Sequence, residues 1–163
     1  MDLISQLKSQ PPGSTFRLFE RGIGGRIKVR PEDFQVEEIP WRDPTGEGDH
    51  LHLFVEKRAT SHGELMAILA KTVGCNARDV GYAGMKDKAA VTRQWVSLPA
   101  HLADAAPHLN HERVRLLGTI RSDRALRRGD LRGDRGRAAF RRFHGHVDTF
   151  VLHRPVRWVG FKY

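Results

Sequence analysis

A short segment of mixed charge contains the side chains best suited to chemistry. Asp87 is flanked by Lys86 and Lys88 in the run Gly84-Met85-Lys86-Asp87-Lys88. Two nearby ammonium groups favour the ionised form of a carboxyl group, so we expect Asp87 to be charged at neutral pH. A charged carboxylate on a loop held by strands can act as a nucleophile or as a general base. The same tripeptide is also typical of a solvent-exposed turn with no chemical role.

Two strands are predicted to hold this loop in place. Residues 80–83 are predicted to form a short strand, and residues 91–98 alternate apolar and polar side chains as a second strand does. Gly84 permits a bend between them that a residue with a Cβ would resist. The loop would then present Asp87 at its tip.

A second segment combines a basic strand with an aromatic residue. Residues 26–30 alternate with a period of two, which predicts a strand with one basic face that includes Lys28. A turn at residues 31–34, which includes Phe34, follows, and an extended segment resumes at residues 35–39. An aromatic ring beside a basic strand can stack on a nucleotide base, although a large aromatic is also commonly a core residue.

Both segments resemble the TruD family of tRNA pseudouridine synthases. Residues 84–94 are similar to the family signature Gly-x-Lys-Asp-x-x-Ala-Val-Thr-x-Gln, and residues 28–38 to Lys-x-x-Pro-Glu-Asp-Phe-x-Val-x-Glu. The resemblance implies that Asp87 is the catalytic nucleophile, that Lys28 lies in the active site and that Phe34 contacts the substrate. It further implies tRNA as the substrate, uridine 13 as the target, and neither a cofactor nor a metal.

Three more residues are expected to bind the substrate. Lys86 and Lys88 would keep Asp87 ionised and meet phosphates of the RNA backbone. After Gly133 the family continues with Asn-x-Phe, and here Asp134 stands in place of an asparagine that helps to shape the substrate pocket.

The resemblance to family motifs ends at Gly133. We therefore expect a partial pseudouridine synthase catalytic domain over residues 1–133 and a basic, disordered tail without family resemblance over residues 134–163. The chain has about half the family's usual length, which suggests a truncated or frameshifted product. Its net charge is +9, and residues 121–163 contain 12 Lys and Arg against 4 Asp and Glu. Basic chains commonly bind nucleic acid, but this excess lies outside the segment with the candidate chemistry.

Composition excludes several other classes of protein. The single cysteine, Cys75, excludes a disulfide framework and a four-cysteine zinc site. His50 and His52 share one strand face, but no third ligand lies at a recognisable spacing, so no metal is expected. No apolar run approaches the roughly twenty residues that span a bilayer, and no export signal is visible. A cytoplasmic location is therefore expected, and the sequence does not indicate a protein partner.

The remaining pattern predicts an α+β fold. Ser61 and Glu64 have the spacing of a capping box, and Gly74 is predicted to end the helix that follows. The expected apolar stripe of this helix contains Leu65, Ile68, Leu69, Thr72 and Val73. Strands separated by turns, with packed helices, predict a mostly antiparallel sheet, which agrees with an incomplete pseudouridine synthase-like catalytic domain.

Two other interpretations stay open. A non-catalytic RNA-binding remnant would keep the basic surface and lose turnover, because much of the family's pocket is missing. An inactive truncated product would leave sheet edges and apolar faces uncovered, which favours aggregation.

Overall fold

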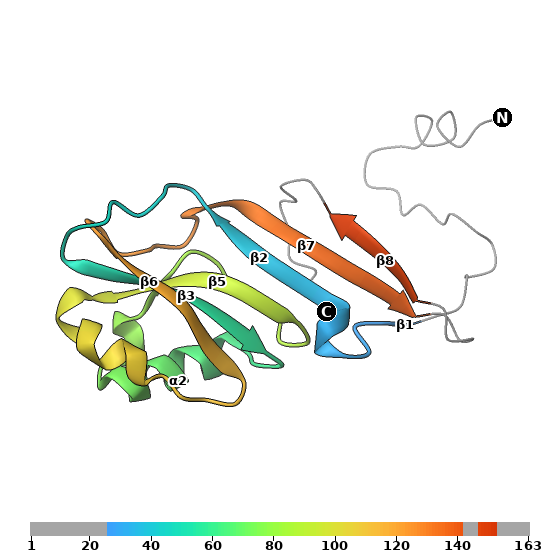
Figure 1. Cartoon of the computed structure of the whole chain (residues 1–163), viewed down its shortest axis with the longest axis horizontal. Helices are drawn as coiled ribbons and strands as arrows, with labels where there is room; N and C mark the ends of the chain where they lie inside the picture. The colour runs from blue at the N-terminus through green and yellow to red at the C-terminus, as the bar shows by residue number, and fades with distance from the viewer. Residues whose placement is uncertain (1–25, 142–146, 153–163) are drawn as a thin grey trace.

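The protein is organised around one β-sheet with helical segments packed on one of its faces (Figure 1). A computed structural model describes residues 26–141 and 147–152. In this part of the chain the sheet has eight strands in the order β1-β7-β2-β5-β3-β6, with β4 paired to β5 and β8 paired to β7. The strands are β1 (Arg26–Ile27), β2 (Phe34–Pro40), β3 (His50–Arg58), β4 (Gly81–Tyr82), β5 (Val91–Pro99), β6 (Val114–Ser122), β7 (Leu131–Arg141) and β8 (Val147–Leu152).

The pairing confirms the predicted fold class. β2 and β5 run parallel, whereas the other strand pairs are antiparallel. The helical segments are η1 (Pro31–Asp33), α2 (His62–Val73), η2 (Ala77–Asp79) and η3 (Ala100–His108). The chain therefore has an α+β fold with a mostly antiparallel sheet. None of the helices in the described ranges is long and apolar enough to cross a membrane.

Helix α2 begins and ends where the sequence predicts. The hydroxyl of Ser61 accepts a hydrogen bond from the amide of Glu64, and the Glu64 carboxylate accepts one from the amide of Ser61. These hydrogen bonds lower the pKa of Glu64 to about 2. Gly74 ends the helix with a φ of 72°, in the left-handed region that glycine adopts without a steric penalty.

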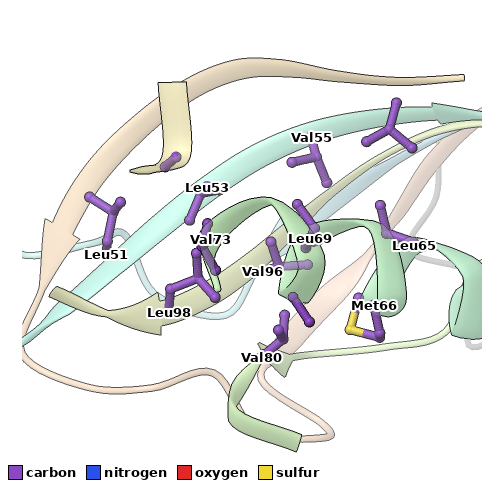
Figure 2. Packing of buried hydrophobic residues seen from close by; sticks show 13 residues of the cluster. Leu51, Leu53, Val55, Leu65, Met66, Leu69, Val73, Val80, Val96 and Leu98 are labelled. Carbon is purple, nitrogen blue, oxygen red and sulfur yellow. The ribbon is translucent and has the colours of Figure 1, made fainter. Parts of the chain in front are cut away.

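The main core lies between α2 and the sheet. Side chains of α2 pack onto Leu53 and Val55 of β3 and Val96 and Leu98 of β5 (Figure 2). The buried face of the helix differs slightly from the predicted stripe, and it contains Leu65, Met66, Leu69, Ala70 and Val73. Ile68 is only partly buried, and the Thr72 hydroxyl instead donates to the carbonyl of Ile68. A second, smaller cluster joins Phe34 and Val36 of β2 to Ala90.

Two expected elements differ in the structure. The basic strand expected over residues 26–30 ends at Ile27, because Lys28 has a φ of 55° and the chain turns there. The boundary expected after Gly133 falls inside β7, where Asp134 lies opposite Glu38 of β2. Residues 134–141 are therefore part of the sheet and form no separate tail, because their backbone pairs with β2 and β8. Residues 1–25 of the expected catalytic domain, and residues 142–146 and 153–163 of the expected tail, lie outside the described residues.

Candidate active site

The parallel pair of strands brings the two motif segments together. β2 and β5 lie side by side, with Gln35 opposite Val91. Neighbouring parallel strands begin at the same end of a sheet. Consequently the segment before β2, which contains Lys28, and the loop before β5, which contains Asp87, lie at the same end. The C-terminal end of β3 lies at this end as well, because β3 runs antiparallel to β5 with Lys57 opposite Thr92.

Asp87, Lys28 and Phe34 form one contact cluster at this end of the sheet. The Asp87 side chain is 54% exposed, and its Oδ2 accepts a hydrogen bond from Lys28 Nζ at 2.5 Å. The same Nζ lies 4.1 Å from the centroid of the Phe34 ring. The left-handed backbone at Lys28 turns the chain back toward the loop. One ammonium group therefore contacts both the carboxylate and the aromatic face.

Phe34 itself is a core residue with a polar neighbour. It is only 5% exposed and packs with Val36 and Ala90, so its ring forms the floor of the cluster. The cation–π contact with Lys28 covers the ring on the side of Asp87. A base that stacked directly on this ring would have to displace Lys28.

The two lysines next to Asp87 have different environments. The Lys86 side chain is 4% exposed, and its Nζ lies 2.7 Å from Glu38 Oε2 and 3.2 Å from Asp134 Oδ1. Lys86 is buried because its ammonium group pairs with these two carboxylates. In this position the ammonium group is not exposed to a phosphate, contrary to the expectation from the sequence. Lys88 is 63% exposed and lies 3.6 Å from Glu64. The cation that pairs with Asp87 is Lys28, from the other motif.

Asp134 lies beneath the loop with Glu38. The two carboxylates come from directly opposed positions on β7 and β2, and the Lys86 ammonium lies between them. Burial raises the pKa of Glu38 above its ordinary value, although Lys86 opposes this shift. Two carboxylates and one ammonium group thus form a buried ionic cluster that fastens the Asp87 loop to the sheet. The structure places Asp134 in this cluster.

Glycine at position 84 is favoured by the space available rather than by backbone freedom. It is not among the glycines of positive φ. A Cβ at this position would lie 3.1 Å from Lys86 Nζ and 3.2 Å from Leu131 Cδ2. The close approach of these two groups therefore favours glycine here.

Sequence reasoning missed Lys57 and Glu38. Lys57 is fully buried, and its Nζ donates to the carbonyls of Thr60 and Asp87, each at 2.7 Å, and of Lys86 at 3.4 Å. Burial lowers the pKa of Lys57 to about 8, while the charge of Asp87 acts in the opposite direction. The signal was in the strand alternation: Lys57 follows Leu53 and Val55 on the core face of β3, as Glu38 follows Phe34 and Val36 on β2.

No metal-binding cluster is found in the described ranges. No group of three or more His, Cys, Asp or Glu side chains gathers there in a way that could hold an ion. The ring of His52 is buried, and its Nε2 lies 2.8 Å from the carbonyl of Arg124. This contact gives His52 a structural partner.

A hollow of about 330 Å³ does not have Asp87 in its lining. Its lining comes from β2, β5 and β7 and includes Arg93, Arg135 and Arg137. The only carboxylate in it, Glu37, is paired with Arg93. None of the six predicted site residues lines this hollow, so its chemistry suits an anionic ligand and not a nucleophilic reaction.

Comparison with known proteins identifies the relatives of this site. The model of the family tRNA pseudouridine synthase D (TruD) matches residues 14–149. The chain belongs to the TruD family. The match continues past Gly133, where the motif resemblance ended, and it includes all of β7. Both motif segments and the Asp87 cluster lie within it.

The relatives are considerably longer than this chain. A tRNA pseudouridine synthase D of Thermus thermophilus is 46% identical over 127 residues, which are 77% of this chain and 36% of the relative. An Anaeromyxobacter relative of the same name is 43% identical over 120 residues, or 74% of this chain and 34% of the relative. The crystal structure of a candidate TruD protein from Methanosarcina mazei superposes with a TM-score of 0.67 at 30% identity, covering 74% of this chain and 28% of that chain. The chain thus spans about a third of the length of these relatives.

Proposed function

We propose that this chain is a tRNA pseudouridine synthase that isomerises uridine 13, with Asp87 as the nucleophile. The observation that carries this proposal is the exposed Asp87 carboxylate paired with Lys28 above the Phe34 ring. Membership of the TruD family, whose relatives are named tRNA pseudouridine synthase D, supports tRNA as the substrate. A cytoplasmic location goes with a tRNA substrate and is part of the same proposal.

In the proposed reaction the uridine leaves its stack, because its glycosidic bond is otherwise inaccessible. The Asp87 carboxylate attacks C1′ of the ribose, the bond from N1 to C1′ breaks with its electron pair staying on the uracil, and the base turns. C5 then attacks C1′ and displaces the Asp87 carboxylate, the C5 hydrogen leaves as a proton, and N1 takes up a proton. No cofactor or metal is needed for these steps.

The surrounding residues support this nucleophile in different ways. Lys28 holds the carboxylate in one orientation through a charge-assisted hydrogen bond. Lys88, which is exposed beside Asp87, would bind a backbone phosphate in this proposal. Lys86 and Asp134 act from below, because their ion pair fastens the loop on which Asp87 lies.

The proposal is tested with unmodified tRNA that carries tritium at C5 of uridine. Isomerisation releases this tritium into water, because C5 loses its hydrogen when it bonds to the ribose. We expect tritium release that grows with the amount of chain and saturates at one equivalent per tRNA. Absence of release with the chain in excess over tRNA would contradict the activity.

Phe34→Leu is expected to lower kcat/KM for tRNA about tenfold. The leucine fills most of the buried volume but offers no aromatic face to Lys28. The lost cation–π contact is worth about 1 to 2 kcal/mol when it is partly desolvated. Phe34→Tyr, which keeps the ring, is the matched control and should stay close to wild type if its hydroxyl is accommodated. Kinetic measurement on both variants checks this. Equal kcat/KM for the leucine variant and wild type would leave Phe34 with a packing role alone.

A second candidate function is a non-catalytic RNA-binding module. The short span of the chain relative to its relatives favours it, as do the exposed Arg135 and Arg137 that line the hollow on β2, β5 and β7. Binding through arginines and phosphates weakens steeply as salt rises. Salt-sensitive tRNA binding without tritium release would favour this candidate over the enzyme.

A further inference from the structure

The Asp87 loop lacks regular secondary structure where precision matters most. Residues 84–87 belong to neither a helix nor a strand. The loop is tied by the amide of Gly129 to the carbonyl of Ala83 and by the amide of Ala59 to the carbonyl of Ala90. Both ties lie at its ends. The position of the Asp87 main chain must therefore be set by contacts in the middle of the loop.

Within the loop the Lys86 side chain is held by its ion pairs with Glu38 and Asp134, and Lys57 supplies the contacts to the main chain. An ammonium group has three N–H donors, and Lys57 directs them to the carbonyls of Thr60, Lys86 and Asp87. The Lys57 side chain extends from β3, and this strand is paired on one side with β5 and on the other with β6. A rigid strand thus holds the carbonyl of the same residue whose carboxylate meets Lys28.

Lys57 carries a buried charge, which is costly to desolvate. The residue is 0% accessible, and its hydrogen bonds go to main-chain carbonyls rather than to a carboxylate. An apolar side chain of similar length would avoid this desolvation cost, but it would leave the carbonyls of Thr60 and Asp87 without this donor and would not fix the direction of the loop.

We propose that Lys57 is a positioning residue that holds the Asp87 carboxylate at Lys28 by binding the main-chain carbonyls of Lys86 and Asp87. This inference rests on the proposed function of Asp87 as the nucleophile. Lys57 does not touch the substrate, because its side chain lies beneath the loop. Its loss should therefore slow the chemical step and leave tRNA affinity nearly unchanged.

Lys57→Met tests this role, because methionine has a similar length and no donor. We expect kcat to fall about 100-fold, the order of loss that follows a misplacement of about 1 Å, while the Kd for tRNA changes less than about threefold. We also expect faster hydrogen–deuterium exchange in residues 84–90, since the loop loses its central tie. The exchange measurement needs no catalytic activity, so it decides the inference even if the chain proves not to isomerise uridine.

Val55→Ala is the matched control. Val55 lies two residues earlier on the same buried face of β3, and its side chain has no hydrogen-bond donor for the loop carbonyls. This variant should be less stable than wild type yet keep its kcat and the exchange rate of residues 84–90. Lys57→Gln, which retains two N–H donors, should lie between wild type and Lys57→Met.

The inference is overturned if folded Lys57→Met keeps both wild-type kcat and wild-type exchange in the loop. It is also overturned if Val55→Ala loses as much kcat as Lys57→Met, because the effect would then follow stability. If neither Lys57 variant folds while Val55→Ala does, Lys57 is a folding residue and the positioning role is wrong. Wild-type tritium release, measured in parallel, separates these outcomes from failure of the proposed function.

Discussion

Replacing Asp87 with alanine is expected to lower the rate of isomerisation by about 10⁴-fold or more, as removal of a catalytic nucleophile does in other enzymes. The Asp87 side chain is 54% exposed and is not part of the hydrophobic core, so the fold should survive. Binding of tRNA should survive too, because a phosphate backbone is attracted by the cations that remain. Tritium release and tRNA affinity, measured on the same preparation, check both parts.

Two further variants sharpen this prediction. Asp87→Asn keeps the shape and one oxygen acceptor for Lys28 but lacks a nucleophilic carboxylate, so it should be as inactive as the alanine variant. Asp43→Ala removes an exposed carboxylate in the loop between β2 and β3 and should leave the rate unchanged. Substantial turnover by Asp87→Asn would show that Asp87 is not the nucleophile.

Lys86→Met is expected to destabilise the fold by about 3 to 5 kcal/mol, the usual cost of removing one partner from a buried ion pair. The variant would leave Glu38 and Asp134 facing each other beneath the loop without their shared cation. Burial already raises the pKa of Glu38, and loss of Lys86 raises it further because that ammonium now lowers it. Equilibrium unfolding in urea measures the change.

The pH dependence of this variant has a definite sign. A carboxyl group whose pKa is raised by folding binds its proton more tightly in the folded state, so its folded state gains stability as the pH falls toward the unfolded pKa. Lys86→Met should therefore recover part of the lost free energy of unfolding between pH 7 and pH 5. Wild type should change less over the same interval.

Lys88→Met is the control for this effect. Lys88 is two residues away, is mostly exposed, and has one carboxylate partner on the surface. A surface ion pair contributes little, so this variant should lie within about 1 kcal/mol of wild type. Similar losses for the two variants would contradict a buried ionic cluster beneath the loop.

The cluster of Asp87, Lys28 and Phe34 was predictable from motif resemblance but not from local pattern. Lys28 and Asp87 are 59 positions apart, and their contact depends on the parallel pairing of β2 with β5. Strand alternation predicts which face a residue occupies, but it does not specify which strands become neighbours. The resemblance to known motifs supplied the residues, and the sheet supplied their meeting point.

Charged residues on the core face of strands were the missed signal. Lys57 and Glu38 continue apolar alternations on β3 and β2, and such positions are buried only when a partner is available. Those partners lie in the Asp87 loop, which is distant in sequence: the carbonyls of Lys86 and Asp87 for Lys57, and the Lys86 ammonium for Glu38. Partners that are distant in sequence also determine the different burial of Lys86 and Lys88, because Lys86 pairs with Glu38 and Asp134 and Lys88 does not.

Pairing with a strand that is distant in sequence also explains why the boundary expected after Gly133 falls inside a strand. Arginines dominate the sequence from there, and alternation is weak, so the segment was expected to be a disordered tail. In the structure, residues 134–138 pair with β2 through backbone hydrogen bonds that do not depend on side-chain type. By contrast, the limits of α2 were predictable, because a capping box and a terminal glycine are local signals.

The most direct test of the account is to incubate the purified chain with unmodified tRNA and to map pseudouridine chemically along the whole tRNA. If Asp87, at the N-terminal ends of β2 and β5, is the nucleophile, one new pseudouridine should form at position 13, and the Asp87→Ala chain should form none. If tRNA is bound but no pseudouridine forms with wild-type chain in excess, the chain is a binding module and the account of Asp87 is wrong.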